Sequence, residues 1–456
     1  MNPNWLYHDD MYRFDEPESS YWEATAGNVD IDTARLEGDR QCEVAVIGGG
    51  YTGLSAAYHL ARDHDIEAHV LEAGHIGWGA SGRNAGFCCI GASPLDLEVQ
   101  VSRYGLESTR HFYRAQVEAV ELVRSIIDAE EIDTPIQGDA EIEVAVSERS
   151  FDDVKKHAER QFRLLGLDTE VLTRDEMRER CFDTPAQFGA AFVRPAFGLH
   201  PMRYIQGLAA AAEHRGAKLY AQSEVVEWQR NGAQHLLRTK RGSLNARYVI
   251  VATNGFTPEH LHAAFKGRPL PMISAMFATR RLSDDELAAH RWQTESTAIT
   301  ARVLLNYFRL LPDRRFLFGG RGHSTGSREG AEKNYSMLVA RFREMWPEWR
   351  RVEIDYRWHG LICLTRRLTP SVGRLPDEPS VFFGFGYHGN GVNTATWTGK
   401  MIADWLGRTG VDDVAVPEDL PLMMRDLPGH IPVPSLRLFY IWARLSWYRV
   451  KERLAG

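Results

Sequence analysis

Cysteine is scarce in this chain, and its spacing excludes two kinds of site. There are five cysteines among 456 residues, and Cys88 and Cys89 are adjacent rather than separated as in a C-x-x-C pair. Zinc sites and dense disulfide frameworks need paired cysteines at regular spacing. The sequence therefore predicts neither a metal site nor a disulfide scaffold, and it favours a cytoplasmic protein with reduced thiols.

Long apolar runs and an excess of basic charge are also missing. No stretch reaches the roughly 18 apolar residues that a membrane-spanning helix needs. Residues 1–25 are acidic and aromatic and lack the basic start of a secretory signal. The formal net charge of −7 argues against nucleic acid as a partner. Because 456 residues are too many for one hydrophobic core, we expect two domains.

What the chain has instead is glycine at defined places. The apolar run Val44–Ile47 is typical of a strand buried on both faces of a parallel sheet. Gly48, Gly50 and Gly53 follow it in the pattern G-x-G-x-x-G, and apolar residues continue at helical spacing from Leu54. Such glycines allow a tight turn, close approach of backbone to a pyrophosphate, and packing of the helix on the strand.

An acidic residue completes this pattern. A second strand, AHVLEAG, ends in Glu72, about 20 residues beyond the glycines, where a carboxylate accepts hydrogen bonds from ribose hydroxyl groups. Strand, glycine turn, helix, strand and acid arrive in the order of a dinucleotide-binding unit. The small residues of HIGWGASGRNAGF (75–87) then describe backbone lying against a flat ligand. An NAD-dependent dehydrogenase has no reason to place such a loop directly after its second strand.

These motifs, with others along almost the entire chain, resemble the FAD-dependent oxidoreductases of the D-amino-acid oxidase class. Within that class the resemblance is nearest to the gamma-glutamylputrescine oxidase-like proteins. The further segments that carry it are PESSYWEATAG (17–27), GLHPMRYIQGLAAAAEHRGAKLYAQSEV (198–225), ARYVIVATNGFTP (246–258), LNYFRLLPDRRFLFGG (305–320), YRWHGLICLTRRLTPSVGRL (356–375) and FFGFGYHGNGVNTATWTGKMIADWL (382–406).

The resemblance implies an α/β fold, with a glutathione-reductase-like FAD-binding Rossmann domain interleaved with an α+β substrate domain on a mostly antiparallel sheet. The hydrophobic pattern agrees, because residues 107–131 and 148–166 are amphipathic at helical spacing and residues 140–147 alternate like a half-exposed strand. The expected segments are an N-terminal arm (1–39), the FAD domain (40–110, 199–262 and 356–434), the substrate domain (111–198 and 263–355) and a C-terminal amphipathic helix (435–456).

By the same resemblance, non-covalent FAD is expected along several separate stretches of the chain. The three glycines would lie at the pyrophosphate, Glu72 at the adenosine ribose and Val225 at the adenine. The loop from His388 to Val392 would cover the pyrimidine side of the flavin, before a helix starting at Thr394 whose N–H groups favour negative charge. The predicted FAD residues are Gly48, Gly50, Tyr51, Thr52, Gly53, Glu72, Ala73, Gly79, Ala80, Ser81, Arg83, Asn84, Val225, Ala252, Asn254, Gly386, His388, Gly389, Asn390, Gly391 and Val392.

The resemblance also implies candidates for the substrate pocket. They are Arg83, His200, Tyr307, Arg309, Trp358, His359 and His388. Flavin-dependent amine oxidation needs positioning more than acid–base groups, so no catalytic triad is expected. His200 is equally suited to capping the helix that follows Pro201, and the strand face shared by Tyr307 and Arg309 can equally meet solvent. Trp358 and His359 point to opposite faces of a strand, so one of the two is expected to meet substrate.

Three features depart from the family pattern. Where many relatives carry an acidic residue in a T-x-D motif, this chain has Arg366 and Arg367, which either receive a substrate carboxylate or face solvent. Cys363 lies close to the position at which some relatives attach FAD covalently, and we predict non-covalent FAD. Sarcosine-oxidase-like members activate oxygen with a lysine over the flavin, but residues 270–320 contain no lysine. A quinone or other carrier is therefore an alternative to oxygen as acceptor.

Together these observations predict an enzyme that oxidises a C–N bond by hydride transfer to FAD. The first hypothesis for the substrate is a primary or secondary amine of the gamma-glutamylputrescine type, which would give an imine that hydrolyses to an aldehyde. The second is an amino or imino acid such as pipecolate, proline or a D-amino acid. A third hypothesis, of another class, is a non-catalytic flavoprotein subunit that carries electrons.

The C-terminal segment predicts a surface of its own. Leu436, Phe439 and Trp442 recur at three-residue steps within residues 435–456, among several arginines and a lysine. A basic, aromatic amphipathic helix of this kind either packs on protein, which we favour, or lies peripherally on an anionic inner membrane. The oligomeric state stays open.

Overall fold

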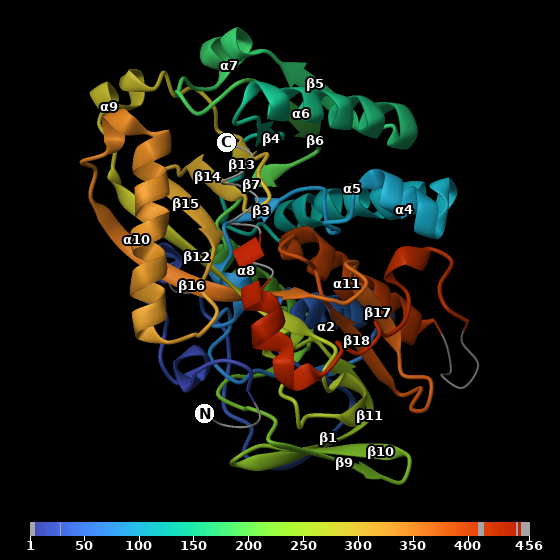
Figure 1. Cartoon of the computed structure of the whole chain (residues 1–456). Coiled ribbons are helices and arrows are strands. Elements are labelled where there is room, and N and C mark those ends of the chain that lie inside the picture. Colours follow the sequence, from blue (N-terminus) through green and yellow to red (C-terminus); the bar gives the residue numbers. More distant parts are fainter. Residues whose placement is uncertain (1–4, 28, 409–414, 444–445, 448–456) are drawn as a thin grey trace.

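The computed structural model describes residues 5–27, 29–408, 415–443 and 446–447, and it builds the chain around two large sheets (Figure 1). The first has the strand order β17-β18-β11-β1-β2-β8, with the β9–β10 hairpin attached to β11. Its strands are β1 (Gly38–Ile47), β2 (Ala68–Leu71), β8 (Lys218–Tyr220), β9 (Glu227–Asn231), β10 (Gln234–Arg238), β11 (Gly242–Val251), β17 (Ser371–Arg374) and β18 (Val381–Phe385).

Apolar strands and helices bury the first sheet. The end of β1, Val44–Ile47, is buried and pairs in parallel with β2 on one side and β11 on the other. Strands that are covered on both faces carry such continuous apolar runs. The labelled α-helices of the described residues are α1 (Tyr21–Thr25), α2 (Tyr51–His64), α3 (Ala80–Arg83), α4 (Leu97–Tyr104), α5 (Leu106–Ala129), α6 (Glu148–Arg160), α7 (Arg174–Arg180), α8 (Pro201–His214), α9 (Asp284–Ala289), α10 (Arg328–Met345) and α11 (Gly391–Gly407).

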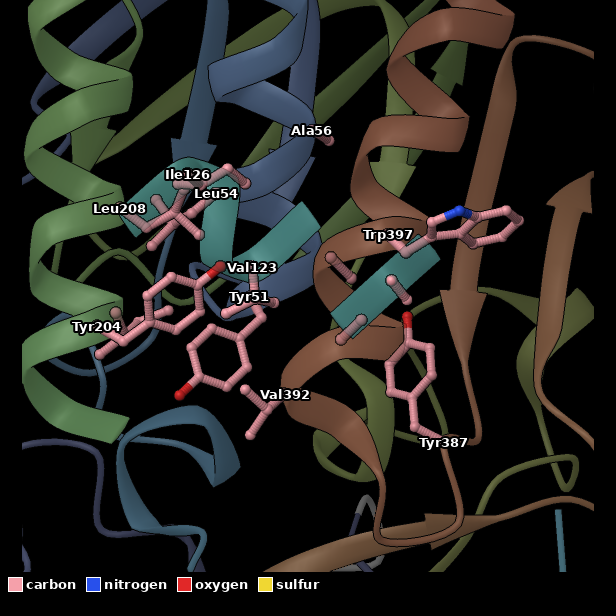
Figure 2. Packing of buried hydrophobic residues seen from close by; sticks show 14 of the residues in the cluster. Tyr51, Leu54, Ala56, Val123, Ile126, Tyr204, Leu208, Tyr387, Val392 and Trp397 are labelled. Carbon is pink, nitrogen blue, oxygen red and sulfur yellow. The ribbon is translucent and has the colours of Figure 1, made fainter. Parts of the chain in front are cut away.

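One hydrophobic core joins four of these helices to the first sheet. Figure 2 shows Leu54 of α2, Leu208 of α8 and Ile126 of α5 gathered at one point on the left, and Trp397 of α11, a member of the same core, on the right. All four side chains are buried. Because this core includes residues of α2 and α11, it fixes the starts of both helices relative to the sheet.

The second sheet is mostly antiparallel, as expected from the family resemblance. Its strand order is β16-β12-β15-β14-β13-β4-β6-β5, and the β13–β4 pair is parallel. The strands are β4 (Glu141–Val144), β5 (Asp168–Leu172), β6 (Ala190–Arg194), β12 (Leu270–Arg281), β13 (Thr297–Thr300), β14 (Asn306–Leu310), β15 (Arg315–Arg321) and β16 (Ile354–Leu364). Helix α10 covers one face (Figure 1), where Phe342 packs against Phe277 and Phe318. A separate two-stranded antiparallel sheet is formed by β3 (Phe87–Cys88) and β7 (Phe197–Gly198).

Two segments lie on the other side of the expected domain boundaries. Strand β16 pairs antiparallel with β12 along its whole length, so the second sheet continues to Leu364 and the boundary at 355/356 falls inside a strand. Helix α5 packs in the core of α2, α8 and α11, although residues from 111 onward were expected in the substrate domain. The apolar faces of β16 and α5 could pack against either sheet. Contacts with segments far away in the chain decide which sheet each of them joins.

The C-terminal helix is only partly described, because residues 444–445 and 448–456 lie outside the described part. Residues 437–443 are helical. Ile441 is buried beside Met272, and Arg437 pairs with Glu259 at 2.7 Å. Phe439 and Trp442 are more than half exposed. In the described part of this helix, one face therefore docks on the protein while an aromatic face meets solvent.

No helix in the described part of the chain is long and apolar enough to cross a bilayer.

Candidate functional site

A cavity of about 420 Å³ lies where the two sheets meet. Pockets of this size are typical of small-molecule and cofactor sites. Its lining comes from the glycine turn after β1, from the ends of β2 and β11, and from the loop before α11. The second sheet supplies the opposite wall through β4, β12, β13, β14, β15 and β16. Segments more than 300 residues apart in the chain, such as Gly48 and His388, thus share one cavity.

The three motif glycines have different structural reasons. Gly48 has a φ of +107°, and a Cβ there would lie 2.9 Å from the carbonyl oxygen of Ala252. A Cβ on Gly53 would lie 2.0 Å from the carbonyl oxygen of Gly48, which shows how closely α2 packs on the turn. A Cβ on Gly50 would meet only the Ser81 hydroxyl within 3.4 Å, at 3.0 Å. The fold therefore requires Gly48 and Gly53, whereas Gly50 mainly keeps the cavity wall bare.

The carboxylate of Glu72 is tied to this turn. It accepts hydrogen bonds from the backbone N–H of Gly49 at 2.8 Å and of Gly74 at 2.9 Å. Burial raises the pKa of Glu72, while these two N–H donors lower it. Because each oxygen can accept a further hydrogen bond, the carboxylate can still bind hydroxyl groups of a ligand in the cavity.

The opposite end of the cavity is formed by the loop from Gly386 to Asn390. The side chain of Asn254 accepts a hydrogen bond from Gly386 N at 2.9 Å, and Asn390 donates to the carbonyl oxygen of Cys89 at 2.7 Å. His388 has a φ of +56°, and its Nδ1 is buried without a partner. Burial lowers the pKa of His388 to about 3, so the ring is neutral near pH 7. Helix α11 starts at Gly391, three positions earlier than expected.

Tyr307 on β14 projects from the second sheet into the cavity. Its hydroxyl lies 2.9 Å from the Ser274 hydroxyl on β12. Burial raises the pKa of Tyr307 to about 12, so it stays protonated. Gly319 faces Tyr307 across the β14–β15 pair, and a Cβ at Gly319 would lie 2.0 Å from the tyrosine ring. The missing side chain of Gly319 therefore makes room for the Tyr307 ring. The sequence alone did not assign a role to this glycine.

Glu141 on β4 adds a carboxyl group to the same wall. Burial raises its pKa from 4.5 to about 7, and a hydrogen bond with the Cys89 thiol opposes that shift. A second charged residue of this wall is Arg321, at the end of β15. The strand pattern predicts a half-exposed face for Glu141, and Arg321 lies one residue beyond the segment 305–320 that carries the family resemblance. The alternation of Glu141 with buried Ile142 indicates that Glu141 lies on the more polar face of the strand. Only the fold shows that this face lines a cavity.

A family model for FAD dependent oxidoreductases (DAO) matches residues 43–405 of this chain. The match covers more than half of the 456 residues. This chain belongs to the FAD dependent oxidoreductase family. The family assignment confirms the expected enzyme class and makes FAD its cofactor.

Relatives and solved structures agree with this assignment. Gamma-glutamylputrescine oxidoreductase of Escherichia coli is 30% identical over 443 residues, which are 96% of this chain and 99% of that protein. The crystal structure of glycine oxidase from Geobacillus kaustophilus has a TM-score of 0.65 at 23% identity, covering 82% of this chain and 97% of the other. L-proline dehydrogenase from P. horikoshii has a TM-score of 0.66 at 20% identity, over 83% and 96% of the two chains. The two structures show a shared fold.

The cavity has the features that FAD requires. The glycine turn lies bare at the N-terminus of α2, where N–H groups attract phosphate, and Glu72 offers acceptors to hydroxyl groups. Of the predicted FAD residues, those that line the cavity are Gly48, Gly50, Tyr51, Thr52, Glu72, Ala73, Gly79, Ala80, Ser81, Arg83, Asn84, Val225, Ala252, Asn254, His388, Gly389, Asn390, Gly391 and Val392. Gly53 and Gly386 lie outside the lining, in the turns that support it.

The residues predicted for the substrate pocket divide into two groups. Arg83, Tyr307 and His388 line the cavity, and Arg83 pairs with Glu18 of the N-terminal arm at 3.1 Å. Four others do not line it. Trp358 is buried and donates to the carbonyl oxygen of Arg83, while His359 lies 3.7 Å from Glu18.

The remaining two of that group, His200 and Arg309, line a separate, smaller cavity. His200 caps α8, because its ring accepts a hydrogen bond from Arg203 N at 3.2 Å. Arg309 shares its strand face with Tyr307, yet it reaches a different cavity because the two side chains lie one strand repeat apart along β14.

Arg366 and Arg367 stand where many relatives carry the acidic residue of the T-x-D motif. They also lie outside the large cavity. Arg367 is partly buried and donates to the carbonyl oxygens of Pro370 and Met424, and Arg366 donates to the carbonyl oxygen of His430. Both side chains thus bind backbone at the start of β17 and in the C-terminal segment. Neither lies in the large cavity, where the resemblance would have a substrate carboxylate bind.

Proposed function

We propose that this enzyme oxidises the C–N bond of a primary or secondary amine of the gamma-glutamylputrescine type, using FAD bound non-covalently in the large cavity. When bound, FAD supplies a two-electron acceptor that takes a hydride from the carbon next to nitrogen. The imine that leaves would hydrolyse to an aldehyde. The 30% identity with gamma-glutamylputrescine oxidoreductase over nearly both full chains supports this substrate class.

The observation that carries the proposal is the carboxyl group of Glu141 in the cavity wall. An alkylamine is an ammonium ion at neutral pH, and a buried carboxylate is the partner that a cation requires in an apolar cavity. Other residues of the cavity lining, Met276, Ile299 and Leu305, are apolar and suit the alkyl part of such a substrate. In this arrangement Glu141 selects for a positively charged amine.

Glu141 also has a pKa suited to proton transfer. A protonated amine has no lone pair and cannot give up hydride, so its proton must first leave. A carboxyl group whose pKa is about 7 accepts a proton near neutral pH more effectively than an ordinary glutamate. In the proposed mechanism a carboxylate oxygen of Glu141 takes that proton, and the Tyr307 hydroxyl, fixed by Ser274, hydrogen-bonds to a polar group of the substrate farther along the wall.

The surrounding residues have supporting roles in this proposal. The neutral ring of His388 and the loop to Asn390 line the cavity on the side of the first sheet. Arg83 is neutralised by Glu18, so it adds little net charge to the site. Arg321 is a further charged residue of the cavity lining.

Arg321 favours a second candidate, the oxidation of an amino or imino acid. A guanidinium binds carboxylate in a bidentate manner, and the side chain of Arg321 lies in the same wall as Glu141. An amino or imino acid would then place its carboxylate on Arg321, and Glu141, which lies three strands away in the second sheet, would not contact the same small molecule. Pipecolate, proline and D-amino acids belong to this class.

The experiment compares these candidates by anaerobic reduction of the enzyme-bound flavin. The substrates are gamma-glutamylputrescine, putrescine, pipecolate, proline and D-alanine. For each substrate the rate of flavin reduction is measured as the loss of flavin absorbance. We expect the fastest loss with gamma-glutamylputrescine, and a Glu141→Gln variant should lose most of that rate while Glu179→Gln, an exposed control, keeps it. Faster reduction of the flavin by the amino acids than by either amine would favour the second candidate, oxidation of an amino or imino acid.

The non-covalent attachment has its own support and test. Cys363 lines the cavity, but burial raises its pKa to about 12. The thiolate is the reactive form of cysteine, so this thiol is a poor nucleophile. Acid precipitation should release all the flavin into the supernatant, and yellow colour retained in the pellet would show a covalent link.

A further inference from the structure

A second cavity lies farther along the same face of β14, beside Arg309, and shares no lining residue with the first. Its volume is about 160 Å³. The N-terminal arm, the start of α8, the end of β14 and the segment before β4 meet there. The lining residues are Tyr21, Trp22, Thr25, Pro135, Gln137, Leu199, His200, Arg203, Arg309, Pro312 and Asp313.

Arg309 is a buried cation that has no anionic partner in this cavity. Its side chain is 1% exposed, and no carboxylate of the described residues lies within ion-pair distance of it. One terminal nitrogen donates to the carbonyl oxygen of Leu199, the other lies 3.5 Å from the amide oxygen of Gln137, and Nε has no partner. Burial lowers the pKa of Arg309 to about 9, and the side chain is still charged near pH 7. A buried charge without a partner is costly.

Further donors in the same cavity lack acceptors. The indole Nε1 of Trp22 is buried without a partner, and so is Nε of Arg203. The ring of Trp22 lies 5.6 Å from the guanidinium carbon of Arg309. These groups can donate hydrogen bonds but cannot accept them. The cavity thus presents several unused donors around two guanidinium groups, of which Arg203 pairs with Asp133 at 3.2 Å and Arg309 has no carboxylate partner among the described residues.

The other titratable groups that face the cavity do not neutralise Arg309. Asp313 pairs with Arg315 at 3.1 Å, and Tyr21 hydrogen-bonds to that same carboxylate. Burial lowers the pKa of His200 to about 3, so its ring is neutral. Because that ring accepts from Arg203 N through Nδ1, its Nε2 carries the proton and donates to the Thr25 hydroxyl.

We propose that this second cavity is a binding site for a small carboxylate. The planar guanidinium of Arg309 would hold the carboxylate oxygens, and the Trp22 indole would donate a further hydrogen bond. The apolar walls, Pro135, Leu199 and Pro312, suit a short alkyl chain. The volume of about 160 Å³ limits the ligand to a few carbon atoms. This site is separate from the proposed oxidation of an amine and does not depend on it.

The test uses the full-length, FAD-loaded protein, with sodium propionate as probe and propionamide as its uncharged control. Titration calorimetry measures binding, and the flavin absorbance spectrum, followed in parallel, reports binding in the large cavity. The wild type should bind propionate with a dissociation constant on the order of 1 mM. Propionamide should not bind, and the flavin spectrum should stay unchanged.

Three variants separate this site from others. Trp22→Phe keeps the packing of the ring and removes one donor, so it should weaken propionate binding about fivefold. Arg309→Met should weaken it more than about tenfold. Arg163→Met, an exposed arginine of the second domain, is the matched control and should bind like the wild type. If Arg309→Met does not fold, Trp22→Phe still decides.

Three results would overturn the proposal. They are no binding up to about 50 mM propionate, equal affinity in the wild type and Trp22→Phe, or binding that shifts the flavin spectrum and so belongs to the large cavity.

Discussion

Replacing Glu141 with glutamine should stabilise the protein in a manner that depends on pH. Burial raises the pKa of this carboxyl from 4.5 to about 7. Below pH 4.5 it is protonated in both the folded and unfolded states and costs nothing. Between pH 4.5 and about 7 the carboxyl is ionised in the unfolded chain but still protonated in the folded protein, and this difference favours unfolding. Above pH 7 it is ionised in both states, and the free-energy cost to the folded state has reached its full value. The stability that the neutral carboxyl provides is therefore lost as pH rises through 7.

The size of the effect follows from the two pKa values. A difference of about 2.5 units, at 1.36 kcal/mol per unit, corresponds to about 3 kcal/mol. This figure is an upper limit, because the carboxyl faces the cavity and water there can solvate it. Glutamine has nearly the same shape and carries no charge, so Glu141→Gln should gain up to this amount at pH 8 and nothing at pH 4.5.

Urea titrations of the wild type and Glu141→Gln measure this difference. Both proteins are unfolded at the same FAD concentration at several values between pH 4.5 and 8.5, and the midpoints are compared at a common slope. Glu179→Gln, an exposed substitution, is the control for a change of one charge. Parallel pH profiles for the wild type and Glu141→Gln would refute the reasoning, since they would mean that Glu141 titrates as an ordinary glutamate.

Three other predictions address the cofactor, the electron acceptor and the C-terminal helix. Gly50→Val should yield folded but colourless protein, because a Cβ there lies 3.0 Å from the Ser81 hydroxyl and extends into the cavity rather than into the core; full flavin content would contradict it. Substrate-reduced enzyme should react slowly with oxygen in stopped flow and faster with a quinone, since the described lining of the large cavity contains arginine but no lysine; reoxidation by oxygen at the rate of turnover would show an oxidase. Deleting residues 435–456 should lower the melting temperature in detergent-free buffer, because Arg437 and Ile441 dock on Glu259 and Met272; unchanged stability with loss of liposome binding would favour the membrane alternative.

Local sequence was sufficient for the nucleotide-binding unit. The run Val44–Ile47, the glycine spacing and Glu72 are all determined by short-range geometry, since a strand, a tight turn and a helix start each depend on a few neighbouring residues. For this reason the first strands, α2, the motif glycines and Glu72 were located from local sequence, whereas the other residues predicted for FAD came from the family resemblance. The same reasoning located residues 107–131 and 148–166 as helices, which correspond to α5 and to α6 with its short π-helical extension.

The tertiary structure decided what each polar face meets. Alternation in β4 fixed Glu141 and Glu143 on one face, but it could not tell a cavity from solvent, because both accept polar side chains. Alternation in β14 likewise put Tyr307 and Arg309 together, yet one lines the large cavity and the other a separate one. The partners that make this difference come from segments far away in the chain, such as Trp22 for Arg309. Periodicity determines which side chains share a face, and only long-range packing determines whether that face becomes a core, a surface or a binding site.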